Sequence, residues 1–150
     1  MTDSSRTRDK LAFTVLLVDD AEDCLATLGL ALEAAPGFTI RLARTAEAGL
    51  AVLDQEAVSA VVTDLQLPVM TGLELISRIR GQERFSAVPI VAVSAATDPN
   101  TPQAALDSGA NAFFAKPFSP GAVRRKLEEL IYGGEIWGKE ESSVSSREPE

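Results

Sequence analysis

Short apolar runs alternate with longer amphipathic segments along most of the chain, and this alternation limits the possible folds more than any other feature. Apolar runs of this length are typical of buried strands, whereas the intervening segments repeat their apolar residues at helical spacing. Alternating strands and helices predict an α/β domain in which helices cover both faces of a parallel sheet. The expected strands are residues 13–18, the alternating set Phe38, Ile40 and Leu42, residues 59–63, a strand opened by Pro89, and residues 111–115.

Five helices are expected between and after these strands. Pro36-Gly37 ends the first helix, and Gly109 is expected to end the fourth, because glycine is favoured just past a helix C-terminus. Right-handed crossovers leave few topologies, and the strand order 2-1-3-4-5 is the small doubly wound solution. The helices are expected at about 22–34, after a Thr45 cap, after Gly72 with Leu73, Ile76 and Ile79 inward, at 103–108, and at about 119–131.

Composition narrows the class of partner. The 150 residues favour one domain, and 14 basic against 22 acidic residues give a formal charge of −8. This acidity argues against binding of nucleic acid through its phosphates and against docking on anionic membranes. The polar N-terminus lacks the apolar core of a signal peptide. The absence of histidine excludes histidine catalysis, and the single Cys24 excludes an intrachain disulfide, which fits a cytoplasmic location.

The two ends of the chain differ from its centre. We expect a flexible leader at residues 1–12, a folded domain at 13–132 and a flexible C-terminal tail at 133–150, which is rich in serine and charge. Ile136 and Trp137 are the only large apolar residues of the tail. They could pack back on the domain or mediate a self-contact, so a homodimer is possible.

Five polar residues come where apolar runs end, and the carboxyl ends of parallel strands meet at one edge of a sheet. Asp19-Asp20 alone could simply cap a helix, but two adjacent acids raise each other's pKa unless a cation relieves the repulsion. Mg²⁺ prefers oxygen ligands of this kind. The five residues, which together suit a divalent-cation and phosphoryl site, are Asp19, Asp20, Asp64, Ser94 and Lys116.

Asp64 is the strongest candidate for a reacting group. An acid at the end of a buried strand is a poor structural choice, whereas a carboxylate there can attack a phosphoryl group and form an acyl phosphate. Lys116 supplies a point charge that can pair with a carboxylate and then with phosphate. Ser94 can donate a hydrogen bond to a phosphoryl oxygen. Phosphoryl transfer depends mainly on such positioning and charge neutralisation.

The motifs and their spacing resemble the receiver domain of two-component response regulators, especially chemotaxis-regulator-like receivers that stand alone. The resemblance covers about residues 13–132, with 44 residues from Asp20 to Asp64, 30 from Asp64 to Ser94 and 22 from Ser94 to Lys116. It implies a flavodoxin-like fold. The motifs that carry it are Leu17-Val18-Asp19-Asp20, Asp64-Leu65-Gln66-Leu67-Pro68 with Gly72, Ser94-Ala95, and Lys116-Pro117-Phe118.

By this resemblance Asp64 is the phosphoacceptor, phosphorylated by a histidine kinase or a phosphotransfer protein. Mg²⁺ would be held by Asp20, Asp64 and the backbone carbonyl of Gln66, with Asp19 acting through metal-bound water. Ser94 and Lys116 would contact the phosphoryl group, and the peptide bond between Lys116 and Pro117 would be cis. Ser94 and Phe113 would form a conformational switch that signals to a downstream protein through the face made by the fourth helix, fifth strand and fifth helix.

Three alternatives stay open beside this signalling role, in which the chain is no enzyme and only assists its own phosphorylation and dephosphorylation. An aspartyl-phosphate phosphatase usually has a second acid two residues after the nucleophile, where this chain has Gln66. An FMN-binding module would need a phosphate-cradling loop where the chain has Asp19-Asp20. A receiver-like interaction module independent of phosphorylation is disfavoured because all five site residues are present. Gln66 and Ala96 leave the lifetime of the phosphoryl group open.

Overall fold

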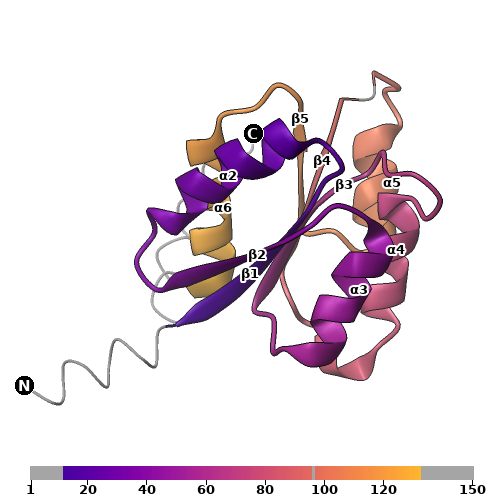
Figure 1. Ribbon diagram of the computed structural model, residues 1–150. Helices are drawn as coiled ribbons and strands as arrows, with labels where there is room; N and C mark the ends of the chain where they lie inside the picture. The colour runs from indigo at the N-terminus through magenta and orange to yellow at the C-terminus, as the bar shows by residue number, and fades with distance from the viewer. Residues whose placement is uncertain (1–11, 96, 133–150) are drawn as a thin grey trace, which may run out of the picture.

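A five-stranded parallel sheet forms the centre of the molecule (Figure 1). The computed structural model describes residues 12–95 and 97–132. The strand order β2-β1-β3-β4-β5 confirms the predicted doubly wound topology. The strands are β1 (Phe13–Val18), β2 (Phe38–Ala43), β3 (Ala60–Asp64), β4 (Ile90–Ser94) and β5 (Ala112–Ala115).

Helices cover both faces of the sheet. In Figure 1, α2 and α6 lie on one face and α3, α4 and α5 on the other. This matches two separate apolar clusters, one on each face, as the pleat of the strands requires. The helices are α2 (Glu22–Glu33), α3 (Ala46–Gln55), α4 (Gly72–Arg80), α5 (Thr101–Ser108) and α6 (Pro120–Tyr132), with a short 3₁₀ turn, η1 (Glu83–Phe85).

Local signals explain where the helices begin. The Thr45 side chain accepts a hydrogen bond from the Ala48 amide, as expected of an N-cap. Thr71 and Glu74 form a capping box at the start of α4. Helix α5 begins two residues earlier than expected, because Pro102 fits the first turn, where its missing N–H costs nothing.

Burial departs from the expected pattern at two places. Leu42 is 53% exposed, although it alternates with apolar neighbours, because β2 is the edge strand and α2 covers only part of it. In α4, Leu75 is fully buried together with Ile76 and Ile79, whereas Leu73 is only partly buried.

The central strands place acidic residues inside the molecule. All residues of β3 and β4 are buried, including Asp64 and Ser94 at their ends. The register aligns Val18 with Thr63, and Asp64 with Val93. Residues that follow β1 therefore meet the ends of β3 and β4 at one edge of the sheet, which we call the carboxyl edge.

Several expectations fall on parts of the chain outside the described residues. These are the leader up to residue 11, the tail at 133–150 with Ile136 and Trp137, and Ala96. Within residues 12–95 and 97–132, no helix has the length and apolar character needed to cross a membrane.

Candidate phosphoacceptor site

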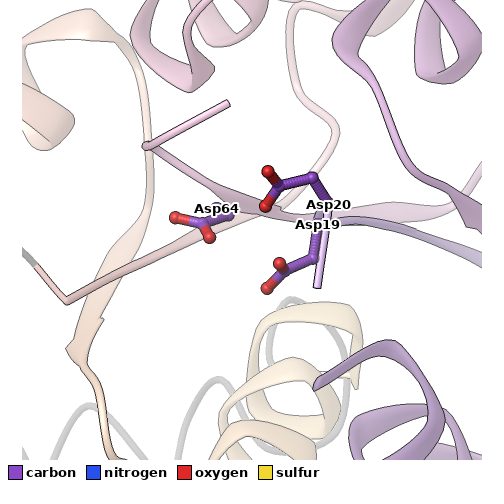
Figure 2. Close-up of side chains that lie close together, drawn as sticks. All are labelled: Asp19, Asp20 and Asp64. Atoms are coloured by element: carbon purple, nitrogen blue, oxygen red, sulfur yellow. The ribbon is translucent and has the colours of Figure 1, made fainter. Parts of the chain in front are cut away.

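Asp19 and Asp20 follow β1 but lie in different environments. Asp19 is only 4% exposed, whereas Asp20 is exposed. Asp19 Oδ1 accepts a hydrogen bond from the Ala21 amide at 2.9 Å, so the carboxylate is fixed at the entrance to α2. Figure 2 shows the carboxyl groups of Asp19, Asp20 and Asp64 close together at the ends of the strands that carry them.

Asp64 ends β3 and is also 4% exposed. Its Oδ1 accepts a hydrogen bond from the Gln66 amide at 2.9 Å. The Thr63 hydroxyl donates to the Asp64 backbone carbonyl, also at 2.9 Å. The Gln66 amide therefore restrains the carboxylate, and the Thr63 hydroxyl restrains the backbone that carries it.

Lys116 joins the two buried acids. Its Nζ donates to Asp19 Oδ2 at 2.9 Å and to Asp64 Oδ2 at 2.9 Å. The lysine follows β5, and its backbone amide donates to the Ser94 carbonyl. Three strand ends thus contribute to one ion-paired cluster.

The pKa values of the two buried carboxyl groups shift in opposite directions. Burial alone would raise the pKa of Asp19, but hydrogen bonds from the Ala21 amide, the Cys24 thiol and Lys116 outweigh it and lower that pKa. Burial raises the pKa of Asp64, and the neighbouring charge of Asp19 adds to the rise, against the bonds from Gln66 and Lys116. Burial of Lys116 is outweighed by its bonds to Asp64 and Asp19, so the pKa of Lys116 is raised.

The three carboxylates have the geometry of a shared cation site. One oxygen from each of Asp19, Asp20 and Asp64 lies within 4.8 Å of the other two. The donors are all hard oxygens, and two of the three carboxylates, Asp19 and Asp64, share the single ammonium of Lys116. This donor set fits Mg²⁺, which binds through a few carboxylates and keeps water for a phosphate ligand.

The remaining expected residues lie around this cluster. Ser94 is completely buried at the end of β4, paired in register with Ala115 of β5. Phe113 is half-buried and packs against the apolar cluster under α3, α4 and α5. Gln66 is exposed, and the peptide bond between Lys116 and Pro117 is cis.

Two residues named from the sequence, Cys24 and Gly72, contribute to the site in ways that the sequence did not predict. The Cys24 thiol hydrogen-bonds Asp19, and burial together with that contact raises the pKa of Cys24 to about 11. The position of Cys24, one turn into the helix after Asp19-Asp20, was the available signal. Gly72 packs on the backbone behind Asp64, where an added Cβ would lie 2.6 Å from Leu65 Cα. A side chain there would therefore displace the phosphoacceptor candidate.

Several known proteins are similar to this chain in sequence. An uncharacterized 14.6 kDa protein of Leptolyngbya boryana is 33% identical over 115 residues, which cover 77% of this chain and 87% of that protein. The chemotaxis protein CheY homolog of Campylobacter jejuni is 33% identical over 79 residues, 53% of this chain and 61% of that protein. The KDP operon transcriptional regulatory protein KdpE of Escherichia coli is 34% identical, and the match covers 78% of this chain but only 50% of KdpE.

Solved structures and a family model show the same similarity. The chemotaxis response regulator CheY4 of Vibrio cholerae has a TM-score of 0.73 and 27% identity, covering 80% of this chain and 99% of that chain. The family model of the response regulator receiver domain matches residues 15–128. The strand order, the charged carboxyl edge and this match together show that the chain belongs to the response regulator receiver domain family.

Proposed function

We propose that the protein is a phosphorylation switch in which Asp64 accepts a phosphoryl group from the phosphohistidine of a histidine kinase or phosphotransfer protein. One observation carries the proposal: Asp64, buried at the carboxyl edge, lies with Asp19 and Asp20 in a 4.8 Å oxygen cluster and contacts Lys116 at 2.9 Å. A carboxylate in such a setting is a nucleophile with its charge-neutralising partners already in place.

In the proposed reaction a carboxylate oxygen of Asp64 forms the new P–O bond. The P–N bond to the donor ring breaks and its electron pair stays on the leaving nitrogen, which takes a proton from water so that neutral imidazole leaves. Both Asp64 oxygens accept hydrogen bonds, and an oxygen bonded to phosphorus is a poor acceptor, so the donor to the attacking oxygen is expected to move. Lys116 is on a flexible stem and can move to a phosphoryl oxygen, whereas the Gln66 amide is fixed in the backbone.

Asp20, Asp64 and the Gln66 carbonyl are the proposed ligands of Mg²⁺, with Asp19 acting through water. When bound, the ion would neutralise charge on the phosphoryl oxygens. Asp19 also holds the amine of Lys116 beside Asp64. Ser94 is proposed to donate to a phosphoryl oxygen.

Signalling is proposed to leave the site through the apolar cluster under α3, α4 and α5, against which Phe113 packs. Movement of Ser94 toward the phosphoryl group would let the half-buried Phe113 turn inward, which changes the surface made by α5, β5 and α6. A downstream protein would bind this surface. The switching unit is proposed to be residues 13–132, with a leader before it and a tail after it, in the cytoplasm.

The competing phosphatase function lacks support in the residues present. Gln66 occupies the position two after Asp64, and a glutamine cannot transfer a proton as a carboxyl group does. The proposal therefore assigns the chain a signalling role in which it assists only its own phosphorylation and dephosphorylation.

Intact mass spectrometry tests the proposal. Incubation with Mg²⁺ and acetyl phosphate should add one phosphoryl mass to the full chain, and Asp64→Asn should abolish the adduct. Asp54→Asn, which removes an exposed acid of α3, is the matched control and should still be labelled. A Mg²⁺-independent adduct, or one that persists in Asp64→Asn, would contradict the proposal. If acetyl phosphate gives no adduct, labelled phospho-kinase replaces it as the donor.

A further inference from the structure

An apolar groove runs along the outer side of β2, the strand at the side of the sheet. It has a volume of about 360 Å³ and lies between α2 and β2. Leu30 of α2 is 71% exposed and Leu42 of β2 is 53% exposed, and both line the groove. Single exposed apolar side chains are common on protein surfaces, but two on either side of one hollow indicate a docking surface.

The groove is open on the α2 side at Gly29, which has no side chain to fill it. Gly29 forms part of its wall, and a methyl group added there would lie 3.8 Å from Leu42 Cδ2, in ordinary contact. Strand β2 pairs only with β1 among the described strands, so its outer backbone edge is available to a further segment.

A row of aromatic rings connects the end of α6 with the start of this groove. The Tyr132 ring lies 5.4 Å from the Phe13 ring, which lies 6.2 Å from the ring of Phe38, the first residue of β2. Ile40 follows Phe38 by two residues on the same face of the strand, a distance of roughly 7 Å. The last residue of α6, Tyr132, therefore lies on the side of the molecule where the groove begins, at Ile40.

The segment that follows Tyr132 has the composition and the reach to occupy the groove. Ile136 and Trp137 come four and five residues after Tyr132, and extended segments of these lengths span roughly 13 and 17 Å. Their side chains add several ångströms, which brings them within reach of Ile40, roughly 19 Å away along this row of rings. Gly133 and Gly134 can adopt any turn that the path requires. We propose that residues 135–139 dock in the groove between α2 and β2, with Ile136 and Trp137 against Leu30, Ile40 and Leu42.

A second hollow competes for the same segment. It has a volume of about 310 Å³ and lies where the strands begin, which we call the amino edge of the sheet. Its lining includes Phe13, Ala87, Leu130 and Ile131. Its large side chains Leu130 and Ile131 are already partly buried against the core. Docking there would remove less apolar surface from water, so the α2–β2 groove is the better site.

Trp137 is the only tryptophan, so its fluorescence in the full chain reports directly on docking. In the unphosphorylated protein we expect emission at shorter wavelength, and weaker quenching by acrylamide, than in the urea-unfolded chain. Leu42→Lys and Leu30→Lys should each move both signals to the values of the unfolded chain, because a charge in the groove opposes burial of the indole. Both positions are exposed, and a melting curve checks that each variant is folded.

The matched control is Ala87→Lys, which places the same charge in the competing hollow at an exposed position. It should leave the Trp137 signal unchanged. If Ala87→Lys exposed Trp137 to acrylamide while both groove variants kept it shielded, the segment would dock in the second hollow and the proposal would be wrong. A signal that falls on dilution, together with a dimer by light scattering, would overturn it in favour of a second copy. An indole as exposed as in the unfolded chain would overturn it outright.

Discussion

The two edges of the sheet each hold a partly buried cation, and the partners of the two cations differ in kind. At the carboxyl edge, Lys116 donates to two carboxylates, Asp19 and Asp64. At the amino edge, Arg80 donates to the Gly109 carbonyl at 2.9 Å, the Phe85 carbonyl at 2.9 Å and Asn111 Oδ1 at 3.0 Å.

The difference indicates what each edge is suited to do. The acceptors of Arg80 are neutral: two backbone carbonyls and Asn111 Oδ1, which also accepts from the Ile90 amide. Neutral acceptors of this kind do not attract a second cation in place of Arg80. The acceptors of Lys116 are two carboxylates that share its single positive charge, so one negative charge of the pair is left over. A second cation or a phosphoryl group can therefore replace part of the pairing at the carboxyl edge.

Backbone conformation follows the same division. The positive-φ residues at the amino edge are glycines, Gly37 and Gly109, which adopt this region without strain. At the carboxyl edge the described chain has Val69 at φ 69°, in the loop between β3 and α4. A β-branched residue in that region is strained, so the loop after Asp64 stores conformational energy that the amino edge avoids.

Removal of the lysine should produce the largest effect and test the chemical role of the carboxyl edge. Lys116→Met should slow the phosphorylation of Asp64 by about 100- to 1,000-fold, or ~3–4 kcal/mol, because a donor to the developing charge is lost. A time course by intact mass measures this rate. Lys126→Met removes a half-buried lysine of α6 that is paired with Glu129 and should leave the rate unchanged. An unaltered rate in Lys116→Met would remove the proposed distinction between the two edges.

Removal of the arginine should affect stability rather than phosphorylation. Arg80→Met removes three hydrogen bonds from a charged donor. The Gly109 carbonyl loses its bond from Arg80, while the Phe85 carbonyl and Asn111 Oδ1 keep only their bonds from the Val88 and Ile90 amides. The free energy of unfolding should fall by about 2–3 kcal/mol. Urea denaturation measures the loss, and Arg78→Met, at an exposed position of the same helix, is the control. A folded Arg80→Met with slowed phosphorylation would show that the amino edge also contributes to the reaction.

The opposite pKa shifts of the two acids predict opposite effects on stability in metal-free buffer. Because its pKa is raised, Asp64 contributes stability to the folded state at pH values below its ordinary pKa of 3.8. That contribution is lost as the pH rises through the folded-state pKa. Asp64→Asn should therefore be more stable than wild type at pH 7, and the gain should vanish as the pH falls toward 3.8.

Asp19→Asn is the matched comparison for this pH dependence. The lowered pKa of Asp19 contributes stability above 3.8, which is lost as the pH falls through the folded-state value. This variant should be less stable than wild type at pH 7, with the loss shrinking in acid. Melting temperatures across pH measure both variants, and shifts of the same sign would contradict the assignment.

Relief of strain should give the smallest effect. Val69→Asn replaces a 92% exposed valine by a residue that tolerates positive φ, and should stabilise the fold by about 1 kcal/mol, or roughly 4 °C in Tm. Val69→Ala, which keeps a Cβ at the same φ, should gain less. Equal or lower stability in Val69→Asn would show that the loop is not strained at this residue.

The sequence by itself predicted the elements and their order, because the periodicity of apolar residues reports local structure directly. It also predicted that Asp19, Asp20, Asp64, Ser94 and Lys116 would share one edge, since parallel strands with right-handed crossovers leave few other arrangements. The Thr45 cap and the Gly109 helix end were local signals of the same kind. Each was confirmed because its physical cause lies within a few residues.

Only the tertiary structure decided how these residues interact. Lys116 is 97 residues from Asp19 and 52 from Asp64, so its bridge between them depends on the packing of three strand ends. Asp19 and Asp64 are the same residue type with the same exposure, and their pKa values diverge because one has more donors around it. Leu42 alternates like a core residue but lies exposed on an edge strand. Periodicity carries no information on such neighbours, because burial and electrostatics depend on contacts made across the whole chain.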